Sequence, residues 1–230
     1  MKTKLAAVCT AVSGLLLASS VALAAELGTL KQVWNGHAEL HNESAVAHNS
    51  SRVDAYGTST VRAENQARVH AYGDSCVEAY GNSEVFGIAK TKIKAHENCR
   101  VEVQGNADVI ASDSSHIDAD GDATVEASGS AHVVARGNAI VKVSDNASVL
   151  ARDNVKVIAS GNAKVIAMGS AIVIASENAS IDAHANTEIT AKDNVSVRAI
   201  KSVKLNKEGE NVRLTVLKKE PDAVTPPVPM

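Results

Sequence analysis

Residues 133–164 read VVARGNAI VKVSDNAS VLARDNVK VIASGNAK, four consecutive octads that each begin with valine. The same phase extends in both directions, so that every eighth residue from position 53 to position 205 is a branched aliphatic. A short period that continues without an insertion indicates a stacked repeat, in which each unit packs against its neighbours. These central aliphatic residues are Val53, Val61, Val69, Val77, Val85, Ile93, Val101, Val109, Ile117, Val125, Val133, Val141, Val149, Val157, Val165, Val173, Ile181, Ile189, Val197 and Leu205.

The residues around each central aliphatic alternate between small and polar. The second residue after it is alanine in most octads, and the second residue before it is small or β-branched, as at Ser59, Cys99 and Ala131. The residues in between are mixed and often charged, and this alternation predicts a strand with one buried face. Pairs such as Gly137-Asn138 then predict tight corners, so each octad would contain about five strand residues and a turn of about three.

The thin inward side chains favour one way of closing the octads into coils. Neighbouring strands lie about 4.8 Å apart, so each coil must return directly above the last. Two octads in each coil would form a flattened solenoid with two facing sheets, whereas three would form a triangular prism that needs bulkier side chains at its centre. The chain has one Phe and one Trp. We therefore predict an all-β fold, a parallel β-solenoid of octapeptide repeats with about 16 residues per coil over residues 51–205.

The first 25 residues have the pattern of a secretory signal. Lys2 and Lys4 form the charged start, residues 15–17 are leucines, and Ala22-Leu23-Ala24 has the small residues of a cleavage site. This stretch is short for a membrane span, and no later stretch resembles one. We therefore expect an exported protein, located in the periplasm, at the cell surface or outside the cell. Removal of the two lysines changes the formal net charge from −3 to −5, which argues against a nucleic-acid partner.

Residues 26–50 break the octad phase. Their apolar residues have a helix-like spacing, so we predict an N-terminal cap made of a short helix or a loose coil, with Trp34 covering the open end of the core. His37, His41 and His48 lie in the same segment. No carboxylate or cysteine spacing in it supports ligation, so we expect solvated polar side chains and no metal site.

The C-terminal end also departs from the repeat. The pattern of residues 206–217 predicts a hairpin that caps the far end of the solenoid. Residues 218–230 contain all four prolines of the chain. This composition predicts an extended, Pro-rich tail.

The sequence has no motif that is typical of an enzyme. There is no G-x-S-x-G, C-x-x-C, H-E-x-x-H, P-loop or G-x-G-x-x-G pattern, and no octad carries an insertion that would build the wall of a groove. We therefore expect neither catalysis nor a cofactor. The corner Asp and Asn residues are interpreted as hydrogen-bonding groups rather than calcium ligands, because calcium-binding β-rolls repeat every nine residues with Gly-Gly, whereas this period is eight and Gly-Gly never occurs. Files of side-chain amides also stabilise stacked strands. The clearest such file would be Asn146, Asn162, Asn178 and Asn194.

Several outward positions carry aliphatic side chains where solvent is expected. A contiguous exposed apolar patch usually marks a contact surface, although β-branched residues also simply suit a strand. We favour a contact surface for self-association. With two octads per coil, one face would carry Val134, Leu150 and Ile166, and the other would carry Ile140, Ile158, Ile172 and Ile174.

The early octads resemble the octapeptide repeats of bacterial ice-nucleation proteins. The resemblance covers residues 51–85 and rests on the stretches AYGTS at 55–59, AYGDS at 71–75 and AYGNS at 79–83. It implies a coil of two octads, as in the solenoid proposed for that family. The Thr-x-Thr rows that face ice in that family are absent from this chain. The overall pattern is more loosely similar to bactofilin-like β-helices.

These observations predict an exported, non-enzymatic structural protein of the bacterial envelope or cell surface that forms homo-oligomers. One alternative is a glycan-binding or surface-binding module in which Tyr56, Tyr72 and Tyr80 stack on sugars. A second alternative is an ice-binding protein.

Overall fold

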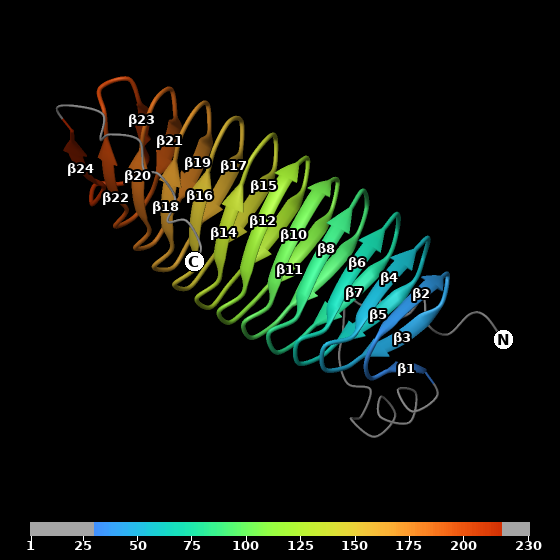
Figure 1. Ribbon diagram of the computed structural model, residues 1–230. Helices are drawn as coiled ribbons and strands as arrows, with labels where there is room; N and C mark the ends of the chain where they lie inside the picture. The colour runs from blue at the N-terminus through green and yellow to red at the C-terminus, as the bar shows by residue number, and fades with distance from the viewer. Residues whose placement is uncertain (1–29, 218–230) are drawn as a thin grey trace.

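A computed structural model describes residues 30–217 as a β-solenoid of twelve coils (Figure 1). Each coil contributes one strand to each of two parallel sheets of 12 strands, and no helix occurs in this range. The predicted fold class is therefore confirmed. The predicted secretory signal and Pro-rich tail lie outside the described residues.

The odd-numbered strands form one sheet and the even-numbered strands form the other, which we call the odd sheet and the even sheet. The odd sheet contains β1 (Lys31–Val33), β3 (Ser44–Ala47), β5 (Thr60–Ala63), β7 (Cys76–Ala79), β9 (Lys92–Ala95), β11 (Asp108–Ala111), β13 (Thr124–Ala127), β15 (Ile140–Val143), β17 (Lys156–Ala159), β19 (Ile172–Ala175), β21 (Glu188–Ala191) and β23 (Lys204–Lys207). The even sheet contains β2 (His37–His41), β4 (Arg52–Tyr56), β6 (Arg68–Tyr72), β8 (Glu84–Ile88), β10 (Arg100–Gly105), β12 (His116–Gly121), β14 (His132–Ala135), β16 (Ser148–Ala151), β18 (Lys164–Ala167), β20 (Ser180–Ala183), β22 (Ser196–Ala199) and β24 (Arg213–Val216).

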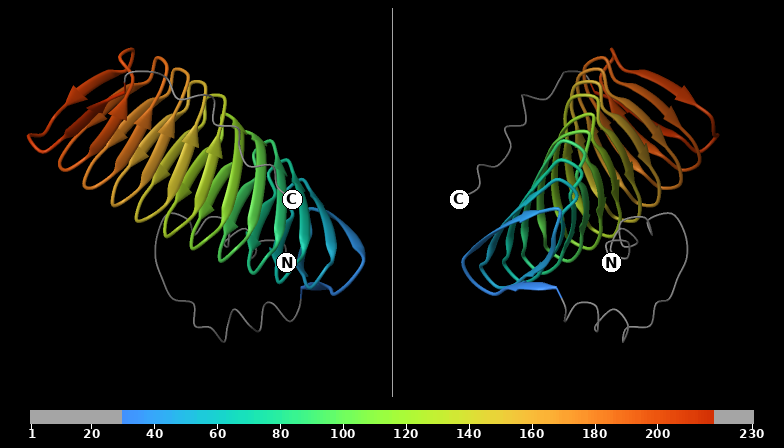
Figure 2. Two further views of the ribbon diagram at one scale, coloured as in Figure 1. Left: turned by 60° about the vertical axis from the view of Figure 1, so that its left-hand side comes forward. Right: turned by 90° about the vertical axis from the view of Figure 1, so that its right-hand side faces the viewer.

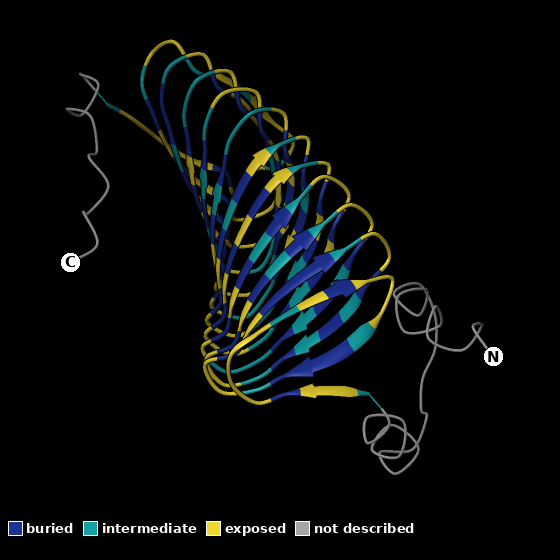
Figure 3. Ribbon diagram, turned by 45° about the vertical axis from the view of Figure 1, so that its right-hand side comes forward, coloured by how far each residue is buried: buried dark blue, intermediate teal, exposed yellow. Residues whose placement is uncertain are grey.

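Strands pair so that equivalent positions of octads 16 residues apart lie side by side. Val133 pairs with Val149, and Val149 pairs with Val165, so each strand is followed in its own sheet by the strand two octads later. All the central aliphatic residues are buried between the sheets except Leu205, which is partly buried. Buried and more exposed residues alternate along the strands, as Figure 3 shows. At about 4.8 Å per coil the rod is about 53 Å long, and its coils rotate progressively along the axis (Figure 2).

The corners are closed by hydrogen bonds between successive coils. Many corner residues have a left-handed backbone, including Asp145 with φ 55° and Glu177 with φ 60°. The carboxylate of Asp145 accepts the backbone N–H of Gly129 at 3.0 Å, and that of Glu177 accepts the N–H of Gly161 at 2.9 Å. These corner acids therefore satisfy backbone donors of the preceding coil, as the hydrogen-bonding interpretation predicted.

The predicted file of asparagine amides is present along one edge of the rod. The Asn162 amide donates to the side-chain oxygen of Asn146 at 3.3 Å, and the Asn194 amide donates to that of Asn178 at 3.4 Å. Such bonds pair polar side chains of consecutive coils and add to the backbone ladder.

The solenoid begins earlier than the octad pattern predicted. Residues 31–47 form β1, β2 and β3, so a helix or loose coil is wrong for this part of residues 26–50. Lys31 pairs with Ala45, which is two positions short of a full two octads, and His37 pairs with Arg52, which is one position short. Shorter corners shift the octad phase while the strands keep their place.

Trp34 does not cover the core. Its side chain lies at the corner between β1 and β2, is 58% exposed, and stacks on the ring of His48 with 4.1 Å between ring centroids. The predicted role as a plug is therefore wrong. The tryptophan packs on the outside of the next coil.

The C-terminal strands are not a hairpin. β23 and β24 belong to different sheets, and each extends its sheet in the parallel direction. Ser196 pairs with Arg213, one position beyond two octads, because the last corner is longer. Leu214 and Val216 continue the inward rows of β22 but are 41% and 57% exposed, since they form the last coil.

Candidate functional surfaces

Four isoleucines gather on the outer face of the odd sheet, and we call them the isoleucine patch: Ile140, Ile158, Ile172 and Ile174. They come from β15, β17 and β19, and each strand presents two outward positions. Ile140 and Ile172 flank Lys156 in one row, and Ile158 and Ile174 are in register in the next row. Exposure is 41% for Ile140, 37% for Ile158 and 44% for Ile172, so the patch lies open on a sheet face.

Charged side chains border the isoleucine patch at both ends. On the N-terminal side Lys142 forms an ion pair with Glu126, with 2.7 Å between Nζ and Oε1. On the C-terminal side Glu188 of β21 is in register with Ile172. Lys156 itself lies inside the patch, between Ile140 and Ile172. The row therefore runs from apolar to basic, apolar and acidic along the rod.

The predicted aliphatic file on the opposite face is also present. Val134, Leu150 and Ile166 are in register on β14, β16 and β18 of the even sheet. Only Ile166 is exposed, at 37%, and the file is one residue wide. It lies between polar rows that include His132 and Arg136. This surface is narrower and less apolar than the isoleucine patch.

The structure divides the three tyrosines proposed to bind glycans between the two faces. Tyr56 and Tyr72 stack on adjacent strands of the even sheet, with 4.9 Å between ring centroids, and His41 stacks on Tyr56 at 5.0 Å. Tyr80 follows β7 of the odd sheet, where it stacks on His96 at 4.9 Å. Sugars bind tyrosine through the flat face of the ring, and these faces largely cover one another.

Tyr80 also contacts a charged side chain. The Arg62 guanidinium lies over its ring, 4.6 Å from the centroid, in a cation–π contact. Burial raises the pKa of Tyr80 to about 12, and the neighbouring Glu78 carboxylate acts in the same direction. The Tyr80 hydroxyl therefore keeps its proton at pH values where an ordinary tyrosine has already lost it.

A polar cluster on the first coils was not predicted from the sequence. His37 Nε2 lies 2.8 Å from Asp54 Oδ2, and the two residues come from neighbouring strands β2 and β4. Glu39 is in register with Asp54, and one ligand atom of each of His37, Glu39 and Asp54 lies within 4.8 Å of the others. In the described range no other group of three such side chains gathers this closely.

Asp54 is the buried member of this cluster, only 7% exposed. Burial raises the pKa of its carboxyl, but hydrogen bonds from His37 and Arg52 outweigh that effect, so the pKa lies below its usual value. The imidazole of His70, on β6, approaches the same carboxylate, with 3.4 Å between Nδ1 and Oδ1. Asp54 is therefore an ionised group that cationic or ligating side chains surround.

The other histidines have separate partners. His48 Nδ1 lies 3.0 Å from Glu64 Oε2, and the ring also stacks on Trp34. His116 and His132 are in register on β12 and β14, with 5.4 Å between ring centroids. The histidines of residues 26–50 therefore do not converge on one point: His37 contacts Asp54, His41 stacks on Tyr56, and His48 stacks on Trp34.

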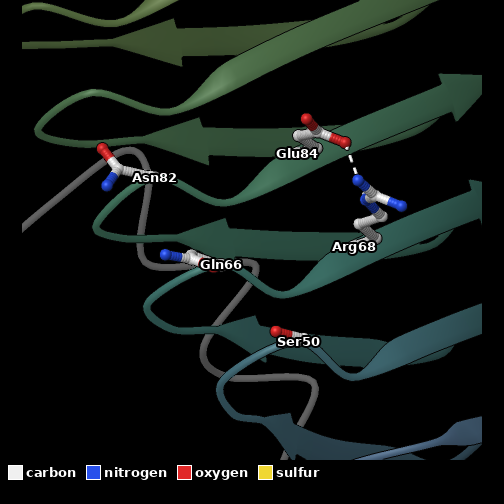
Figure 4. A pocket seen from close by; sticks show the side chains of 5 residues that line it. All are labelled: Ser50, Gln66, Arg68, Asn82 and Glu84. Atoms are coloured by element: carbon white, nitrogen blue, oxygen red, sulfur yellow. Dashed lines mark ion pairs between the residues drawn. The ribbon is translucent and has the colours of Figure 1, made fainter.

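A polar groove follows one corner of the early coils (Figure 4). It has a volume of about 350 Å³ and is lined by Ser50, Gln66 and Asn82 at the corners and by Arg68 and Glu84 on β6 and β8. Arg68 and Glu84 form an ion pair at 2.9 Å across neighbouring strands. The groove contains no nucleophile paired with a base.

Searches for similar proteins found no match to this chain among protein-family models, curated proteins or solved structures. Residues 30–217 contain no helix long and apolar enough to cross a membrane.

Proposed function

We propose that this chain is an exported, non-enzymatic structural protein that associates with itself through the isoleucine patch. The observation that carries the proposal is the exposure of Ile140, Ile158 and Ile172 on three consecutive strands of one face. Exposed apolar side chains that form a contiguous patch on a flat surface are typical of contact sites. The secretory signal pattern supports a role outside the cell, and the short corners throughout residues 30–217 support a role without catalysis.

Burial of the patch would favour a contact. A fully exposed isoleucine gains roughly 1.5–3 kcal/mol when its side chain leaves water. Ile140, Ile158 and Ile172 are 37–44% exposed, so each would gain a fraction of that amount, from which the costs of association are deducted. The sheet face is preformed, so little ordering is needed at the contact. A flat β surface also packs well against another flat β surface, with the two sheets about 10 Å apart.

The order of charges along the row of Lys156 suggests how two copies would pair. An antiparallel dimer with its twofold axis along β19 would place Ile172 and Ile174 against the same residues of the other copy. The same symmetry would bring Lys156 of each copy opposite Glu188 of the other, because these residues lie one strand to either side of Ile172. In this arrangement Ile158 would lie opposite Thr190 and Ile140 opposite Lys204, so the self-complementary part of the contact is formed by Ile172, Ile174, Lys156 and Glu188.

The first test measures the mass of the chain that begins at residue 26 by sedimentation equilibrium over a range of concentrations. We expect a reversible oligomer. Changing Ile140, Ile158 and Ile172 to threonine should shift it to monomer without unfolding it, because threonine also suits a strand. The matched control changes Val134, Leu150 and Ile166 to threonine on the other face. A monomeric unaltered chain, or equal loss in the control, would contradict the proposal.

The second test addresses the orientation of the two copies. Lys156→Glu and Glu188→Lys should each weaken association by about tenfold, because each places like charges opposite one another. The double variant Lys156→Glu with Glu188→Lys should regain most of the affinity. If the double variant is weaker than both single variants, the copies do not pair about β19.

The two alternative functions receive less support from the surfaces. Glycan binding would need open tyrosine faces, whereas Tyr56 and Tyr72 cover each other. Ice binding would need threonines in register, and the outward Thr60 and Thr124 neighbour Cys76 and Ile140 instead. Both remain hypotheses that glycan arrays and ice-recrystallisation assays would test.

A further inference from the structure

We infer that His37, Glu39 and Asp54 bind a divalent transition-metal ion, with zinc as the best fit, at the N-terminal end of the even sheet. The site lies on β2 and β4, at the blue end of the rod in Figure 1. It does not depend on the proposed self-association, because the isoleucine patch lies on the other sheet and many coils away.

Strand geometry brings the three ligands together. His37 and Glu39 are two residues apart on β2 and so point to the same side of the sheet. Asp54 lies directly beside Glu39 in the parallel pairing of β2 with β4. One nitrogen or oxygen of each residue lies within 4.8 Å of the other two. Zinc binds such atoms at about 2.0–2.2 Å, so ligands around one ion lie about 3–4 Å apart and small side-chain rotations suffice.

The charge arrangement also favours a cation at this point. Glu39 and Asp54 are carboxylates on neighbouring strands, and like charges in register destabilise a sheet. Asp54 is nearly buried, so its charge needs a close partner. Arg52 now supplies part of that balance, with 3.2 Å between its Nε and Asp54 Oδ1. The Arg52 side chain is 52% exposed, so it can turn into solvent when an ion arrives.

The kind of ligand selects the kind of ion. One imidazole and two carboxylates suit zinc and its neighbours in the transition series, whereas calcium prefers oxygen ligands only. His70 approaches the far oxygen of Asp54, with 3.4 Å between Nδ1 and Oδ1. It would act as an outer partner that orients the Asp54 carboxylate, or turn inward as a fourth ligand. Water would complete the coordination.

A bound ion would connect β2 to β4 by a contact outside the backbone ladder. These strands belong to the first coils, where the pairing falls one position short of two octads and the end of the sheet is free to open locally. The expected consequence of binding is therefore local: slower amide hydrogen exchange in β2 and β4, with little change near the isoleucine patch.

The test is a calorimetric titration of the chelator-treated chain with zinc chloride at neutral pH. We expect one equivalent of zinc to bind to the unaltered chain. His37→Ala and Glu39→Gln should each abolish this binding or weaken it by at least about tenfold. Both residues are exposed, so their substitution should leave the fold intact, which circular dichroism will check. Asp54→Asn is a third variant of nearly unchanged shape.

The matched control is the double variant His116→Ala with His132→Ala. It removes two imidazoles that also lie on adjacent even-sheet strands but have no such pair of carboxylates beside them. Zinc binding should be unchanged in this control. Absence of zinc binding to the unaltered chain would overturn the inference. Equal binding by the His37→Ala, Glu39→Gln and unaltered chains would overturn it as well.

Discussion

The first coils and the central coils of the rod have the same backbone plan but differ in coil length and in surface chemistry. Neighbouring strands of the first coils pair one or two positions short of two octads, whereas those in residues 125–175 pair at two full octads. The outward rows carry imidazoles, carboxylates and aromatic rings in the first coils, and isoleucine and lysine in the central coils.

The inward rows of the two regions are alike. Leu40 and Ala45 are buried in the first coils as completely as Val141 and Val157 are in the central coils. The inward rows therefore maintain the solenoid, while corner length and outward residues vary without breaking it. Each coil depends mainly on its two neighbours, so a local change in length need not spread.

The largest expected effect is on the inward row of the central coils. Val141→Asp should cost more than about 3 kcal/mol of unfolding free energy, because it places an unpaired charge between the sheets. Lys142→Asp should cost less than about 1 kcal/mol, because its exposed ion pair with Glu126 contributes little. Urea unfolding followed by circular dichroism measures both values.

Val33→Asp extends this comparison to the first coils. Val33 is also buried, at 7% exposure, but it lies in the end strand of the odd sheet. The substitution should cost less than Val141→Asp, because an end strand can open locally without loss of the remaining coils. Equal costs at the two positions would show that the rod unfolds as one unit from end to end.

A smaller effect is expected at the corners. Gly161 has φ +65°, and a methyl group there would lie 2.8 Å from the backbone nitrogen of Asp145 in the preceding coil. Gly161→Ala should therefore cost about 1–3 kcal/mol, from backbone strain together with the close contact. Gly36 has φ +89° but no atom within 4 Å of the added carbon.

Gly36→Ala is accordingly the matched variant from the first coils. It should cost only about 1 kcal/mol, the strain of a left-handed alanine. Melting temperatures of the two variants under identical conditions test the difference. A Gly36→Ala variant that is as unstable as Gly161→Ala would mean that the preceding coil contributes no steric constraint.

The smallest effect is the alkaline titration of Tyr80, the tyrosine stacked on the odd sheet. Its folded pKa of about 12 exceeds the usual value of about 10. The folded state therefore holds the proton more tightly, so the contribution to stability is complete below pH 10 and is lost as the pH rises towards 12. A titration of tyrosinate absorbance against pH should show a step at the highest pH in the unaltered chain, and this step should be missing in Tyr80→Phe. If the step persists in Tyr80→Phe, the raised pKa does not belong to Tyr80.

The sequence predicted most of the regular solenoid and the composition of its outer rows. The isoleucine patch was found because outward positions follow the same period as inward ones. Tyr56 and Tyr72 are two octads apart and lie on neighbouring coils, as the period requires. Tyr80 was grouped with them, but it lies one octad after Tyr72 and therefore on the opposite face.

The ends could not be predicted in the same way. A helix or loose coil was expected in the first segment because the octad phase is lost there, yet the strands persist with shorter corners. The His37 cluster was missed for the same reason. Pairing at two full octads would have placed Glu39 beside Ala55, whereas the shorter first coil places it beside Asp54.

Within the regular octads the sequence by itself determined the strand, the turn and the facing of each side chain, because an eight-residue period repeats the same local environment in successive coils. Only the tertiary structure decided how the irregular first and last coils pair and which outward side chains meet there. The physical reason is that strand register depends on the length of each corner. One or two residues more or less in a corner change which residues of neighbouring strands pair, without changing the pattern of the strand itself.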